Sequence, residues 1–78
     1  MKVIICGAGK VGTSIARHLV SQQNDVTVID QSVNLIDEIR EKVDLKTING
    51  SASNPSILKK AGADEADMII AVTLHDEI

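Results

Sequence analysis

The chain has 78 residues and a formal charge of −3, 44% of its residues are hydrophobic, and it contains no Phe, Trp or Tyr. A chain of this length forms at most one small domain, which buries only about 60% of the surface that its unfolded form exposes. The acidic balance and the lack of aromatic rings argue against a nucleic-acid partner, because nucleic-acid binding needs a cationic surface and, for single strands, stacking platforms.

The cysteine content and the hydropathy of the sequence indicate a cytoplasmic protein. Cys6 is the only cysteine, so no internal disulfide forms, which fits a reducing compartment. No apolar run approaches the roughly 20 residues that a membrane-spanning helix needs. We therefore expect no direct membrane insertion.

Short apolar runs alternate with stretches of helical periodicity, a pattern that is typical of parallel strands joined by crossover helices. The sequence predicts a strand at residues 3–6, a helix over about residues 10–22 and a second strand at residues 26–29. Ser32 is the expected N-cap of a second helix, because its hydroxyl can accept a bond from a free backbone N–H group.

The second half of the sequence continues this alternation. It predicts a third strand at residues 45–48, a short helix that begins at Pro55 and is ended by Gly62, and a fourth strand at residues 68–72. Residues 73–78 are expected to form a loop that begins another helix. The whole pattern predicts an α/β fold, a doubly wound parallel sheet of the Rossmann type with the strand order 3-2-1-4.

The third and fourth predicted strands differ in charge. Lys46 lies within the third, and a lysine is a common means of protecting an exposed sheet edge. The fourth has no charge, as expected of a strand whose faces and edges are all covered. We therefore expect residues 1–78 to be the N-terminal portion of a larger doubly wound domain, cut after its fourth strand. If the chain folds alone, we expect a second copy to cover this strand; the alternative is a strand with buried faces beside an open edge.

A glycine-rich motif lies directly after the first predicted strand and opens the first predicted helix. Its residues, which match G-x-G-x-x-G, are Gly7, Ala8, Gly9, Lys10, Val11 and Gly12. In this motif the first glycine makes the tight turn, the second lets the backbone approach a pyrophosphate, and the third allows close packing of the helix on the sheet. The free N–H groups and the positive dipole end of the helix attract phosphate. The alternative is an empty turn that binds no ligand.

Asp30 ends the second predicted strand, where the acidic residue of a dinucleotide site is expected. Its carboxylate can accept hydrogen bonds from both hydroxyls of a ribose, and it would repel a 2′-phosphate placed beside it. The sequence therefore favours NAD or NADH over NADP. AMP, ADP and ATP present the same diol, so Asp30 does not separate these nucleotides from NAD. An exposed turn residue is the alternative interpretation of Asp30.

Other polar residues carry weaker signals. Lys10 can either reach a phosphate or remain solvated, and Thr73 can bond either a ligand on the same rim of the sheet or its own backbone. Neither His18 nor His75 lies beside a nucleophile or a set of metal ligands. We therefore expect no catalytic residues and no metal site, and we interpret Cys6 as a small hydrophobic residue.

The second half of the sequence carries a resemblance to a known family. The residues in question are Asn49-Gly50-Ser51-Ala52-Ser53, Pro55, Leu58, Ala61-Gly62, Ala66-Asp67, Ile70-Ala71-Val72-Thr73 and Asp76-Glu77. With the glycine motif, they make the whole chain similar to the nucleotide-binding domains called RCK or KTN domains, which belong to regulatory subunits of potassium transport.

The resemblance implies roles for particular residues. Gly7 to Gly12 would hold the pyrophosphate and Asp30 the adenosine ribose. Ser51 and Ala52 would lie near the adenine, and Thr73 and Leu74 would border the remaining ribose and phosphates.

The resemblance also implies a function without catalysis. The chain would belong to a nucleotide-sensing regulator in the cytoplasm, at the inner face of the cell membrane. It would form homo-oligomers that control an integral-membrane potassium transporter or channel subunit. The alternatives are the N-terminal fragment of an NAD-dependent dehydrogenase, which needs a second mononucleotide half to seat the nicotinamide, and a structural module that merely retains the glycine turn.

Overall fold

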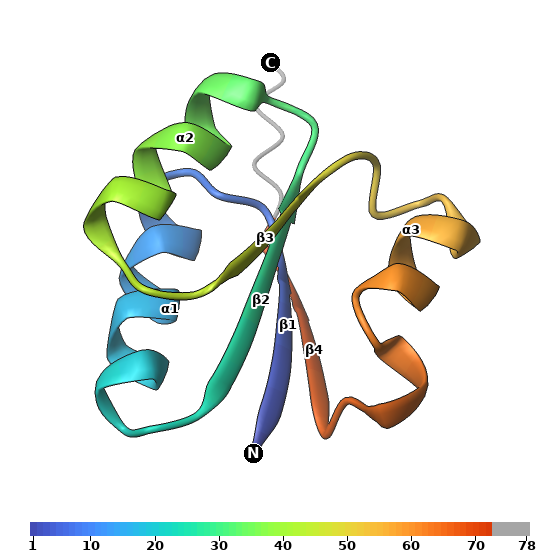
Figure 1. Ribbon diagram of the computed structural model, residues 1–78, viewed down its shortest axis with the longest axis horizontal. Helices are drawn as coiled ribbons and strands as arrows, with labels where there is room; N and C mark the ends of the chain where they lie inside the picture. Colours follow the sequence, from blue (N-terminus) through green and yellow to red (C-terminus); the bar gives the residue numbers. More distant parts are fainter. Residues whose placement is uncertain (73–78) are drawn as a thin grey trace.

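The computed structural model describes residues 1–72, which form a four-stranded parallel sheet with helices on both faces (Figure 1). Its elements, in chain order, are β1 (Lys2–Cys6), α1 (Lys10–Ser21), β2 (Asp25–Asp30), α2 (Val33–Lys42), β3 (Lys46–Asn49), α3 (Pro55–Lys60), the 3-10 turn η1 (Ala63–Glu65) and β4 (Met68–Ala71).

The strands lie in the order β3-β2-β1-β4, and every neighbouring pair is parallel. Figure 1 shows α1 and α2 on one side of the sheet and α3 on the other. Because successive parallel strands need a crossover connection, each helix returns the chain to the same end of the sheet. This arrangement confirms the predicted doubly wound α/β fold and its strand order.

Element ends differ from the predicted ones by a residue at several places. Helix α1 ends at Ser21 because Gln22 is its C-cap and Gln23 adopts the left-handed conformation, with φ of 67°. Strand β3 is shifted forward by one residue, to Lys46–Asn49. Strand β4 ends at Ala71, although the N–H group of Val72 still donates to the Cys6 carbonyl at 2.8 Å. The prediction for residues 73–78 lies outside the described residues.

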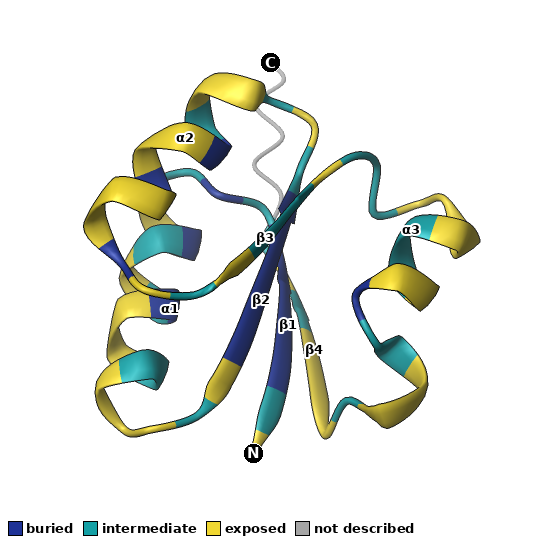
Figure 2. Ribbon diagram, in the orientation of Figure 1, coloured by how far each residue is buried: buried dark blue, intermediate teal, exposed yellow. Residues whose placement is uncertain are grey.

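The two central strands form the core of the molecule (Figure 2). Alternate side chains of β1 and β2 point to opposite faces, so each face has its own apolar cluster. Val3, Ile5, Val26 and Val28 pack with α1 and α2, and a second cluster built around Ile4, Cys6, Ile29 and Ala61 packs under α3. Fully burying a side chain of this size contributes about 1.5–3 kcal/mol, which makes these strands the main source of stability.

Strand β4 lies at an edge of the sheet and keeps large apolar side chains exposed to solvent. Met68 is 43% exposed and Ile69 is 49% exposed, although both are large apolar residues. Within residues 1–72, β4 pairs with β1 alone. The expected cover on its second edge is therefore not supplied by the described part of the chain, and the pairing of two copies stays a prediction.

Candidate nucleotide-binding site

The glycine loop connects the carboxyl end of β1 to the first turn of α1. Gly7 has φ of +124°, a conformation that side-chain-bearing residues rarely adopt, and a Cβ atom here would collide with the backbone oxygen of Val72. Its N–H group donates to the Ile29 carbonyl at 2.8 Å, so the turn out of β1 is tied to the end of β2. The first glycine of the motif therefore makes the tight turn, as predicted.

The other two glycines of the motif differ sharply in their surroundings. A Cβ atom on Gly12 would collide with the carbonyl oxygen of Gly7, so only glycine allows this approach of α1 to the loop. A Cβ atom on Gly9 would meet nothing within 4 Å. Since Gly9 is the N-cap of α1 and its surroundings are open, the free N–H groups of the first helical turn face accessible space.

Asp30 lies at the end of β2 and faces the glycine loop. One of its carboxylate oxygens, Oδ2, accepts a hydrogen bond from the backbone N–H of Ala8 at 2.8 Å, and Oδ1 accepts one from the backbone N–H of Ser32 at 2.7 Å. A carboxylate offers about four acceptor positions, so two remain for the hydroxyls of a ligand. The carboxylate is thus fixed in orientation while it keeps the capacity to bind a ribose.

The backbone around Asp30 is held by the loop that follows β3. The Asp30 carbonyl accepts hydrogen bonds from the Gly50 N–H at 2.9 Å and from Asn49 Nδ2 at 3.0 Å. Asn49 Nδ2 also donates to the Gln31 carbonyl at 3.0 Å. This support was not predicted, because it depends on how the loop after β3 lies against the end of β2.

A cavity of about 140 Å³ opens beside Asp30. It is lined by Cys6, Gly7, Ile29, Asp30, Gln31, Gly50 and Ala52. Ligand pockets usually have volumes of about 300–1,000 Å³, so this cavity has room for one part of a nucleotide, such as a ribose. The structure therefore brings three of the predicted site residues, Gly7, Asp30 and Ala52, to one cavity.

The remaining predicted residues lie elsewhere. Ser51 does not line this cavity, and its hydroxyl is 2.7 Å from that of Ser53 and accepts a bond from the Ser53 N–H at 3.2 Å. Lys10 lines a separate cavity of about 430 Å³ between α1 and α2, which Ala8 and Gly9 also border. Val11 is 53% exposed and lines neither cavity.

Thr73 and Leu74 lie outside the described residues. Cys6 lines the cavity beside Asp30, a role that its position directly before Gly7 could have indicated, and burial raises the pKa of its thiol above the ordinary value of 9.0. Within residues 1–72, no group of three or more His, Cys, Asp or Glu side chains is placed to hold a metal ion.

The fold and the glycine loop place the chain in the Rossmann class of α/β proteins. A family model described as the TrkA-N domain matches residues 3–78, and the chain belongs to this family. This match confirms the resemblance to the RCK or KTN domains. Curated relatives of the chain are named for potassium uptake.

Curated relatives match all or nearly all of this chain. It is 50% identical over 78 residues to the Trk system potassium uptake protein TrkA of Azorhizobium caulinodans, and 48% identical over 77 residues to the protein of the same name from Vibrio alginolyticus. The matched segment covers 100% and 99% of this chain, respectively. It spans only 17% of the length of each relative.

Solved structures share the fold of the chain. The Kef CTD of Shewanella denitrificans in its AMP-bound form is 31% identical, with a TM-score of 0.76 over 95% of this chain and 44% of that one. The Bordetella bronchiseptica enzyme WbmG in complex with NAD has a TM-score of 0.80 over 100% of this chain and 26% of that one. Its 23% identity shows a common fold alone. None of the helices within residues 1–72 combines the length and apolarity needed to cross a bilayer.

Proposed function

We propose that the chain is the nucleotide-binding, N-terminal portion of an RCK or KTN domain in a regulator of potassium transport. Its membership of the TrkA-N family and its identity of about half to proteins named for potassium uptake support this function. The proposed protein binds a nucleotide as a regulatory signal and does not catalyse a reaction of that nucleotide. It forms homo-oligomers at the inner face of the cell membrane, where its partner is an integral-membrane potassium transporter or channel subunit.

The observation that carries the nucleotide site is the hydrogen bond of the Asp30 carboxylate to the Ala8 N–H group at 2.8 Å, beside the open space at Gly9. A ribose bound to Asp30 would have its 5′ phosphates near the first turn of α1. Backbone N–H groups and the helix dipole stabilise negative charge at such a turn. In this proposal residues 7–12 hold the pyrophosphate and Asp30 holds the adenosine ribose.

The other contacts of the proposed site follow from the loop after β3 and from the family. Ala52 lines the cavity beside Asp30, which supports a position near the adenine, and Ser51 is its neighbour in the chain. Thr73 and Leu74 are proposed to border the remaining ribose and phosphates on the family resemblance alone.

NAD or NADH is the proposed ligand, with AMP, ADP or ATP as candidates that share the adenosine contacts. The Asp30 carboxylate disfavours the extra phosphate of NADP by charge repulsion. The Kef CTD of Shewanella denitrificans, which is 31% identical to this chain, was solved in its AMP-bound form, which supports a site for the adenosine part.

A nucleotide controls transport only if it binds two conformations of the regulator with different affinity. The hydrogen bond from Ser32 N–H to Asp30 connects the ribose position to the start of α2. A shift of this helix on binding would provide such a difference. We propose that the oligomer transmits this difference to the membrane subunit.

Calorimetric titration of the chain with NADH, NADPH, ATP and ADP tests the nucleotide site. We expect NADH to bind more tightly than NADPH, and Asp30→Asn to remove this preference. Equal affinity of the unsubstituted chain for NADH and NADPH would exclude the role of Asp30.

Potassium uptake in cells that lack the whole protein tests the transport function separately. We expect reduced uptake that is restored by the unsubstituted gene and not by one with Gly9→Ala. Unaltered uptake in the deleted cells would exclude the function in transport while leaving the binding result intact.

A further inference from the structure

A third cavity, of about 840 Å³, lies between β3 and the carboxyl end of α3. Its walls include Lys46 at the beginning of β3, Ala61 after α3 and Lys2 at the beginning of β1. Since the strands are parallel, the amino ends of β1 and β3 lie at the same edge of the sheet, and the glycine loop lies at the opposite edge, where the carboxyl ends of the strands are. None of the residues that line the cavity beside Asp30 lines this one.

Cationic side chains are concentrated in this cavity. The chain has eight Lys and Arg residues, and the five that line the cavity are Lys2, Arg40, Lys46, Lys59 and Lys60. Two carboxylates, those of Asp64 and Glu65, also line it. The cavity therefore has a net charge of +3, from five cations and two anions, in a chain whose formal charge is −3.

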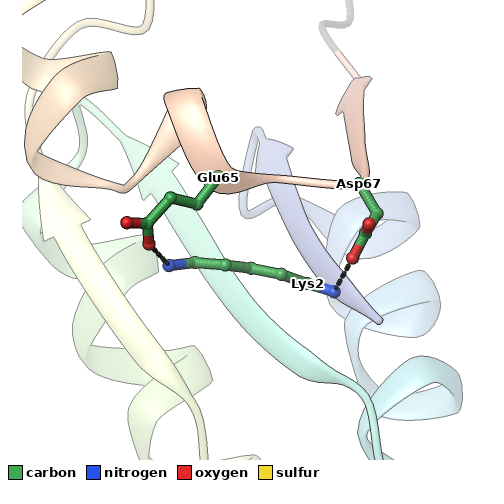
Figure 3. Close-up of polar contacts among 3 residues, drawn as sticks. All are labelled: Lys2, Glu65 and Asp67. Carbon is green, nitrogen blue, oxygen red and sulfur yellow. Dashed lines mark hydrogen bonds and ion pairs between the residues drawn. The ribbon is translucent and has the colours of Figure 1, made fainter.

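Most of this positive charge has no partner in the described structure. Lys2 Nζ lies 3.3 Å from Glu65 Oε1, and the Lys2 backbone N–H donates to Asp67 Oδ2 at 2.7 Å (Figure 3). The Lys2–Glu65 contact is the only ion pair within residues 1–72. The other four cations of the cavity therefore keep their charge available to an anion.

A polar residue also lines the cavity on the face of the sheet. Thr27 is 3% exposed and is the only buried residue with a polar or charged side chain within residues 1–72. In the strand register it lies opposite Lys46 on one side and Ile4 on the other. A hydroxyl at the base of a cavity is suited to bonding a polar ligand, whereas an apolar residue would be usual at such a core position.

We propose that this cavity binds a small phosphorylated anion with two or more negative charges, at a site separate from the proposed nucleotide site. Ammonium and guanidinium groups form strong, charge-assisted hydrogen bonds with phosphate oxygens. The volume lies in the range of small-molecule sites. The ligand is either a soluble phosphorylated compound or the headgroup of an anionic phospholipid, since both present the same phosphate chemistry.

Inorganic tripolyphosphate is the probe for the soluble source. The full chain, labelled with ¹⁵N, is titrated at low salt while its amide shifts are followed by NMR. We expect saturable shifts at residues 46–48 and 61–65, with weaker binding at high salt because small ions screen the charges. A saturated NADH sample, in which the glycine loop is occupied, should show the same shifts. A failure of NADH to bind would count against the proposed nucleotide function and not against this cavity.

A pair of double variants tests the cations of the cavity. We expect Lys46→Gln with Lys60→Gln to weaken tripolyphosphate binding about tenfold or more, because two charges close to the ligand are lost. The control, Arg17→Gln with Lys42→Gln, removes the same charge from the other face of the sheet and should change the affinity less than about twofold. All four residues are exposed, so we expect both variants to keep the thermal midpoint of the unsubstituted chain.

Vesicles of phosphatidylcholine with and without phosphatidylglycerol distinguish the two sources. Binding to the anionic vesicles that is lost in the Lys46 and Lys60 variant and kept in the control indicates a lipid headgroup. Binding of tripolyphosphate without vesicle binding indicates a soluble ligand. The proposal is overturned if neither probe binds, if the shifts occur only at residues 7–12, or if the two double variants behave alike.

Discussion

Asp30 and Ala8 are joined by a hydrogen bond of 2.8 Å between a carboxylate oxygen and a backbone N–H group. This bond crosses from the end of β2 to the glycine loop. The residue proposed to bind the ribose therefore also fixes the conformation of the loop proposed to bind the phosphates. Binding and loop structure are coupled at this one side chain.

Substitution of Asp30 tests this coupling. Asp30→Ala leaves the N–H groups of Ala8 and Ser32 without their acceptor, and we expect it to lower the free energy of unfolding by about 2 kcal/mol. Asp30→Asn keeps one acceptor oxygen and should cost less. Urea unfolding measures both effects. An unchanged midpoint for Asp30→Ala would show that these hydrogen bonds do not stabilise the loop.

The different surroundings of Gly9 and Gly12 predict opposite effects of the same substitution. Gly9→Ala adds a methyl group to open space, so the chain should fold normally but bind nucleotide at least tenfold more weakly, because the methyl group occupies the proposed phosphate position. Gly12→Ala forces α1 away from the Gly7 carbonyl and should cost roughly 1–3 kcal/mol of stability.

Thermal unfolding and NADH titration of these two variants separate folding from binding. The prediction fails if Gly9→Ala binds NADH as tightly as the unsubstituted chain. It also fails if Gly12→Ala is as stable as Gly9→Ala.

Gly62 supplies a left-handed residue between α3 and η1, with φ of +87°. We expect Gly62→Ala to lower the free energy of unfolding by about 1 kcal/mol, chiefly through this conformation. The new Cβ atom would also lie 2.7 Å from Lys2 Nζ, but a flexible side chain can move away. Gly62→Asn should cost less, because asparagine tolerates the left-handed region better. Equal stability losses for the two variants, measured by urea unfolding, would contradict this explanation.

The buried thiol of Cys6 predicts a loss of stability at alkaline pH. Burial raises its pKa above the ordinary value of 9.0, so above this pH the unfolded chain releases a proton that the native chain retains. The native state then binds more protons than the unfolded state, and stability falls as the pH rises from about 9 toward the native pKa. Below this range the contribution of Cys6 is fully present.

Urea unfolding at about pH 7 and about pH 10 measures this dependence. Cys6→Ala is the control: it should be less stable at the lower pH because it leaves a cavity, yet it should lose less stability between the two values. If both chains lose the same amount, the thiol does not contribute, and other groups that titrate in this range account for the loss.

The exposed apolar residues of β4 predict self-association of the isolated chain. A strand edge that lacks a partner can pair with another chain, and Ile69 is 49% exposed. We expect Ile69→Lys to weaken association about tenfold or more in analytical ultracentrifugation, because a charge would be buried between the copies. Val33→Lys, which changes a similarly exposed apolar residue on α2, should have little effect. A monomer at high concentration of the unsubstituted chain would refute the prediction.

The fold could be predicted from the sequence because short, continuous apolar runs, which are typical of buried strands, alternate with stretches of helical periodicity. The positions of the glycine loop and of Asp30 were predictable for a related reason: they depend on local backbone conformation and on the place where a strand ends. The contacts of Asn49 and Gly50 were not predictable, because they depend on how the loop after β3 lies against the end of β2.

The cationic cavity is the clearest case of information that only the fold provides. Lys2, Lys46 and Lys60 are far apart in the sequence, and an acidic composition suggests no site for an anion. Lys46 alone indicated only protection of a sheet edge. The crossover connections bring these three residues to one cavity, where their charges add.

The parallel sheet also sets the order in which the chain can assemble. Strand β1 pairs with β2 through the nearby residues Lys2 and Asp25, but its other edge pairs with β4, where Val3 lies beside Met68. The pairing of β1 with β4 closes the loop of chain between Val3 and Met68, which is much longer than the loop between Lys2 and Asp25. Because closing a longer loop loses more chain entropy, β1 is expected to pair with β2 before β4 docks. During synthesis one edge of β1 therefore stays unpaired until nearly all of residues 1–72 have left the ribosome. In that interval a strand of a neighbouring nascent chain can pair with this edge in place of β4.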